Sequence, residues 1–115
     1  MTDQQLNEDH ITEYVIDFSE LRENKLDESF LRMFGNITKW LLKSMFGGET
    51  HIPVSVRGSR SEVNSFAKAI GSEKRYLDAY KKYGLDDPRT HKSKSMLRGA
   101  VDKFTRATGL KWPFK

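Results

Sequence analysis

Apolar residues recur at spacings of three and four in the segment that follows Asp27, which is the pattern of an amphipathic helix. The stripe consists of Phe30, Phe34, Ile37, Leu41 and Met45, and it is widened by Leu31, Met33, Trp40, Leu42 and Phe46. Its breadth indicates a helix that is buried on more than one side. Asp27 is the expected N-cap, Gly47 and Gly48 the expected end, and Gly35 indicates a kink or a close contact with another helix.

Two further helices are predicted, from about Arg60 to Tyr83 and from about Pro88 to Thr108. Ser59 and Glu62 have the spacing of a capping box, and Asp87 followed by Pro88 is typical of a helix start. The residues expected to face inward are Val63, Phe66, Ile70, Leu77 and Tyr80 in the first of these helices, and Leu97, Ala100, Val101, Phe104 and Ala107 in the second.

Both helices are followed by the same pattern, Gly-Leu-x-x-Pro, at Gly84–Pro88 and at Gly109–Pro113. Glycine supplies a backbone with positive φ, leucine is placed for the apolar contact of a Schellman cap, and proline prevents continuation of the helix. The repeat predicts a helical hairpin followed by a short C-terminal segment, Lys111–Lys115.

Alternating apolar residues predict two short strands, Tyr14–Phe18 and Thr50–Val56, which can pair with each other. The stretch Ser19–Lys25 fits either one helical turn or a loop. The predicted fold is therefore mainly α, with three helices, a C-terminal helical hairpin and a minor two-stranded β pairing. It forms one small domain over residues 13–115, preceded by an acidic N-terminal arm of residues 1–12.

Charge is divided unevenly along the chain. Residues 1–31 hold nine carboxylates against two cations, a net charge of −7, whereas residues 32–115 hold 18 Lys and Arg against seven carboxylates, a net charge of +11. This asymmetry is typical of a chain whose acidic end binds a basic partner or shields a basic surface.

The sequence gives little support to an enzyme. There is no cysteine, and His10, His51 and His91 are far apart without companion ligands at metal spacing. No nucleotide-binding, metalloprotease or hydrolase motif is present, so we expect no catalytic residue, no metal and no cofactor. The run Ile37–Phe46 is interrupted by lysines and too short to cross a bilayer, and the polar N-terminus is not that of a secretory signal, so no membrane partner is expected.

The basic residues of the third predicted helix spread over its whole polar side: Lys92, Lys94, Arg98, Lys103 and Arg106. They are either a nucleic-acid-binding surface or a solvated or protein-facing one. Tyr76, Tyr80 and Tyr83 either stack on bases or pack within the hairpin.

The aromatic C-terminal segment is the candidate protein interface. Trp112 and Phe114 flank Pro113, so they have no helix of their own to cover them, and they pack either back on the domain around Trp40 and Phe34 or into a pocket on another subunit. Glu73 lies within an apolar arc. It is either a catalytic acid or, as we expect, bonded to a tyrosine or a cation of a neighbouring helix or subunit.

The chain resembles small uncharacterised proteins of tailed bacteriophages, especially myophages. The likeness rests on Ser61–Val63, Phe66, Glu73–Lys74, Tyr76, Tyr83–Pro88, Ala100–Val101, Phe104 and Thr108–Lys115, and a similar segment runs from Leu26 to Leu31 and over Phe34–Gly35. It implies a phage-encoded structural or accessory protein, found in the virion or the host cytoplasm, and carries no catalytic residue across.

The leading hypothesis is thus a non-enzymatic virion or assembly protein. It would bind copies of itself or other virion proteins through the acidic arm and the aromatic segment. The alternative is a small basic accessory protein that binds nucleic acid, with the arm masking the basic surface.

Overall fold

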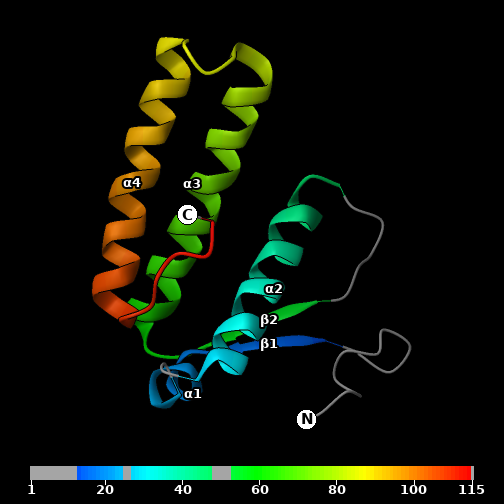
Figure 1. Cartoon of the computed structure of the whole chain (residues 1–115), viewed down its shortest axis with the longest axis vertical. Helices are drawn as coiled ribbons and strands as arrows, with labels where there is room; N and C mark the ends of the chain where they lie inside the picture. The colour runs from blue at the N-terminus through cyan, green and yellow to red at the C-terminus, as the bar shows by residue number, and fades with distance from the viewer. Residues whose placement is uncertain (1–12, 25–26, 48–52, 115) are drawn as a thin grey trace.

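A computed structural model describes residues 13–24, 27–47 and 53–114, and within these ranges the chain is mainly helical (Figure 1). In chain order the elements are β1 (Tyr14–Asp17), α1 (Phe18–Glu23), α2 (Glu28–Met45), β2 (Val54–Arg57), α3 (Arg60–Tyr83) and α4 (Pro88–Thr108). The predicted fold class is confirmed, including the C-terminal hairpin of α3 and α4. The predicted acidic arm, residues 1–12, lies outside the described residues.

One helix more is present than the three expected. The stretch Ser19–Lys25, for which one helical turn or a loop was expected, contains most of α1. This helix starts after Asp17, because the carboxylate of Asp17 accepts hydrogen bonds from the backbone N–H groups of Ser19 and Glu20. Phe18 and Leu21 are the buried residues of this helix. A favourable cap and two apolar anchors are thus enough to fix a helix of six residues.

The two strands pair in parallel, with Tyr14 opposite Val54 and Asp17 opposite Arg57. Parallel pairing requires a long connection, and α2 lies within it. The predicted pairing is confirmed over four residues of each strand. The part of the prediction that concerns Thr50 and Ile52 lies outside the described residues.

The predicted helix starts are confirmed. The Asp27 carboxylate accepts the N–H of Ser29 at 2.8 Å, and the Asp87 carboxylate accepts that of Arg89 at 2.8 Å. Ser59 Oγ accepts the N–H of Glu62 at 3.1 Å, and the Glu62 carboxylate accepts the N–H of Ser59 at 2.8 Å. Each start is therefore fixed by contacts between residues two or three positions apart.

The two Gly-Leu-x-x-Pro patterns end their helices in different ways. Gly84 and Gly109 both have positive φ, at +86° and +76°, as predicted. Leu110 is buried, with 3% of its surface exposed, but Leu85 is 51% exposed. Gly109 is left-handed helical, with ψ 7°, as a Schellman cap requires, whereas Gly84 has ψ 170° and does not form this cap. The turn that contains Leu85 lies at the distal tip of the hairpin (Figure 1).

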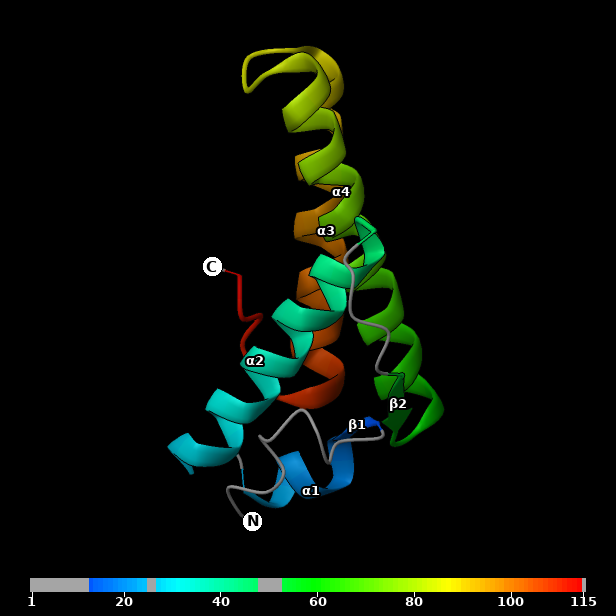
Figure 2. The ribbon, with the colours of Figure 1, turned by 90° about the vertical axis from the view of Figure 1, so that its right-hand side faces the viewer.

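The core lies where α1, α2 and the proximal half of the hairpin meet. Its centre is a cluster of five aromatic rings, in which the centroids of neighbouring rings lie 5.1–6.2 Å apart: Phe18, Phe34, Phe66, Phe104 and Trp112. In Figure 2, α2 crosses the proximal part of the hairpin, while the distal part of α3 and α4 projects beyond it. The hairpin thus has one end built into the core and one end in solvent.

Candidate functional site

The aromatic C-terminal segment packs on its own chain. Trp112 is only 4% exposed and contacts the rings of Phe66 and Phe104, with centroids 6.1 and 5.1 Å away. A side chain at Gly35 would meet Pro113 at 3.7 Å, so the close neighbour of Gly35 is this segment and not the helix that was expected. Of the segment's two expected neighbours, Phe34 lies in the same core cluster as Trp112, and Trp40 packs against the ring of Tyr14, with centroids 5.2 Å apart.

Glu73 is held by that same segment. It is 6% exposed, and its Oε1 accepts a hydrogen bond from Trp112 Nε1 at 2.8 Å. The partner predicted for Glu73 was a tyrosine or a cation, but this bond comes from an indole 39 residues away. Of the five residues predicted at a protein interface, Trp112 and Glu73 are core residues, and Pro113, Phe114 and Trp40 are half-buried.

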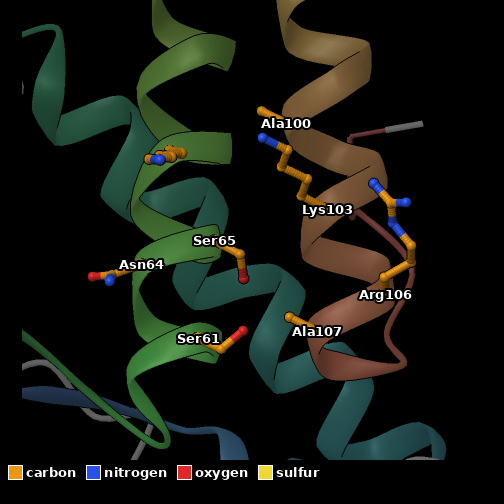
Figure 3. Close-up of a pocket in the computed structure, with 8 residues that line it drawn as sticks. Ser61, Asn64, Ser65, Ala100, Lys103, Arg106 and Ala107 are labelled. Carbon is orange, nitrogen blue, oxygen red and sulfur yellow. The ribbon is translucent and has the colours of Figure 1, made fainter.

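A shallow groove of about 440 Å³ lies between α3 and α4, with α2 behind the hairpin in the view of Figure 3. Its lining residues are Ser61, Asn64, Ser65 and Lys68 from α3 and Ala100, Lys103, Arg106 and Ala107 from α4. Serine and alanine dominate at the seam, and such short side chains leave the space between two packed helices unfilled. The groove is therefore a consequence of residue size on the outer side of the hairpin.

The groove is positively charged. Its eight lining residues include three cations, one on α3 and two on α4, and no carboxylate. The side chains of Ser61, Ser65 and Lys103 point into the space between the helices, and Arg106 lies along the outer side of α4 (Figure 3). Glu62, which adjoins Ser61 in sequence, turns inward, where it is buried and paired with Arg22.

The structure divides the five basic residues predicted on α4 into two sets. All five are exposed. At about 100° per residue, Lys92, Lys103 and Arg106 fall within an arc of about 60°, while Lys94 and Arg98 lie on the other side of the helix. Lys103 and Arg106 line the groove.

Sequence reasoning missed Lys68, because it treated α4 alone. The signal was present in α3, where Ser61, Ser65 and Lys68 recur at spacings of four and three and so share one side of the helix. That side faces the same seam as Ala100 and Ala107. The antiparallel packing of the two helices is what places the three cations at the same seam.

The tyrosines of α3 pack within the distal half of the hairpin. The rings of Tyr76 and Tyr80 stack, with centroids 6.4 Å apart, and the Arg89 guanidinium lies 3.5 Å from the centre of the Tyr83 ring. None of the three lines the groove. Tyr80, expected to face inward, is 44% exposed.

Within residues 13–24, 27–47 and 53–114, no three His, Cys, Asp or Glu side chains come close enough together to hold a metal ion. None of the helices in these ranges has the length and hydropathy to cross a membrane.

No protein-family model matches the sequence, and no curated protein or solved structure is significantly similar to it.

Proposed function

We propose that the protein is a small accessory protein that binds nucleic acid in the groove between α3 and α4. The observation that carries the proposal is a groove lined by Lys68 and Lys103, with Arg106 at its edge along the outer side of α4, and without a carboxylate among the lining residues. Phosphate groups carry the negative charge of nucleic acids, and their neutralisation by Lys and Arg supplies most of the sequence-independent affinity.

The alternative role, as a virion or assembly protein, has less support from the structure. Its main surface was the aromatic segment, which is used within the core of this chain. Its second surface, the acidic arm, lies outside the described residues. The resemblance to phage proteins is compatible with an accessory protein as well as with a virion component.

The test is the binding of a fluorescently labelled 20-base-pair DNA, followed by anisotropy at about 0.1 M salt. Each phosphate contact contributes roughly eightfold in affinity under these conditions. We therefore expect Lys103→Glu to weaken binding about tenfold. Lys94→Glu is the matched control, because it makes the same change of charge at an exposed lysine on the other side of the same helix.

Two results would contradict the proposal. If no complex forms even at low salt, the protein does not bind nucleic acid. If Lys94→Glu weakens binding as much as Lys103→Glu, the overall charge attracts the nucleic acid and the groove is not its site. Arg106→Glu and Arg98→Glu form a second matched pair, for which the same difference is expected.

A further inference from the structure

We infer that the groove takes the sugar–phosphate backbone of a duplex and does not read its bases. This inference rests on the proposed function and adds the class of ligand. It follows from three features of the groove: the donors that line it, the absence of aromatic rings among its lining residues, and the width of the helix pair that carries it.

The lining chemistry suits a phosphodiester. The ammonium groups of Lys68 and Lys103 and the guanidinium of Arg106 can only donate hydrogen bonds, and a phosphodiester is charged and accepts them through its phosphate oxygens. The eight lining residues include no carboxylate that would repel it. Ser61, Asn64 and Ser65 also line the groove and can both donate and accept, so the charge favours a phosphate, and the distance from base edges follows from the width of the helix pair.

The groove lacks the aromatic side chains on which the bases of a single strand could stack. Sequence-independent binding of single strands combines a basic groove with aromatic side chains on which successive bases stack. The groove lining holds no aromatic residue. The tyrosines of α3 lie towards the hairpin tip, where Tyr76 and Tyr80 stack on each other and Tyr83 is covered by Arg89. A duplex does not need such rings, because its bases are stacked already.

The width of the hairpin keeps the groove residues away from base edges. A helix with its side chains is about 10–12 Å wide, and the major groove of B-DNA, at about 12 Å, admits one helix. Helices α3 and α4 lie side by side along the hairpin (Figures 1 and 2). A surface at the seam between two helices therefore meets the phosphates, which stand at the outside of the duplex.

These features fix the expected salt dependence. Each neutralised phosphate contributes about −0.9 to the slope of log K against log salt on B-DNA, so three groove cations give a slope of about −2.7. Lys68→Ala should reduce the magnitude of this slope by about 0.9. Lys94→Ala, the control on the other side of α4, should leave the slope unchanged.

The experiment compares 20-base-pair duplexes of AT-rich, GC-rich and mixed sequence with a 20-nucleotide oligo(dT), using the full chain. We expect the three duplexes to bind within about twofold of one another and the single strand to bind at least fivefold more weakly. A tenfold preference for one duplex, or tighter binding of the single strand, overturns this inference but leaves the proposed function standing. No binding to any of them overturns both.

Discussion

Trp112 offers the sharpest test of how the C-terminal segment contributes to the fold. Its ring is almost fully buried between Phe66 and Phe104, and its indole N–H donates to Glu73. Trp112→Ala removes both interactions and leaves a large cavity, for which substitutions in other cores cost about 3–5 kcal/mol. At roughly 4 °C per kcal/mol for a domain of this size, the melting temperature should fall by about 12–20 °C.

Trp112→Phe separates the two contributions. It keeps a ring in the aromatic cluster but removes the donor to Glu73, a loss of roughly 1–3 kcal/mol for a buried hydrogen bond. Trp40→Phe is the matched control, since Trp40 is half-buried at a site where it packs on the ring of Tyr14. We expect the control to cost less than about 1 kcal/mol.

The assay is urea denaturation followed by far-ultraviolet circular dichroism, because a tryptophan fluorescence signal would itself change with the substitutions. If Trp112→Ala costs less than about 1 kcal/mol, the C-terminal segment is not part of the core. If Trp112→Phe costs no more than Trp40→Phe, the bond to Glu73 does not contribute to stability. Removal of residues 111–115 should cost at least as much as Trp112→Ala, a large fraction of the about 5–15 kcal/mol that stabilises a typical domain.

Three further predictions follow from other parts of the chain. Gly84 has φ +86° and ψ 170°, a conformation almost confined to glycine, so Gly84→Ala should lower the free energy of unfolding by about 1–3 kcal/mol, measured by thermal melting. Gly109→Asn is the comparison, at a left-handed position that Asn tolerates, and should lower it by less than about 1 kcal/mol. The Ser19 hydroxyl, which donates to Asp17, is the main cause that lowers the pKa of this carboxyl below 3.8. The carboxylate therefore stabilises the fold above about pH 4 and less as pH falls through the folded-state pKa, so the difference in melting temperature between Asp17→Ala and the parent should be larger at pH 7 than at pH 3. Deletion of Met1–His10 removes three carboxylates, so the truncated protein should bind DNA more tightly at low salt, measured by anisotropy. An unchanged affinity would contradict the hypothesis that the acidic arm masks the basic surface.

The helix ends could be predicted from the sequence because their determinants are local. Asp27, Ser59 and Asp87 each act on a backbone group two or three residues away, so the surrounding structure has little influence on them. Leu85 and Leu110 show where this reasoning stops. The same local pattern buries one leucine and exposes the other, because burial depends on which elements lie nearby in space.

The candidate site depended on contacts between distant segments, and these were less predictable. The indole of Trp112 reaches Glu73 across 39 residues, and nothing in either local sequence indicates the pairing. The five basic residues of α4 are all exposed, and which of them line the groove depends on where α3 packs. Lys68 lies on α3, so its position in the same groove as Lys103 and Arg106 follows only from the packing of the two helices.

The parallel pairing of β1 with β2 has a consequence for the order of folding. Tyr14 and Val54, which face each other across the sheet, are about 40 residues apart in sequence, whereas only the short turn after Tyr83 connects α3 to α4. Loop closure should cost about 2 kcal/mol more for the sheet than for the hairpin, which corresponds to a roughly 30-fold difference in rate.

We therefore expect α3 and α4 to associate before the strands do. Substitutions at the hairpin seam should slow folding, while substitutions in the strands should mainly speed unfolding. The cations of the groove all belong to the part of the chain that assembles first. During folding, the basic surface would thus form before the N-terminal half of the chain packs on the aromatic side of the same hairpin.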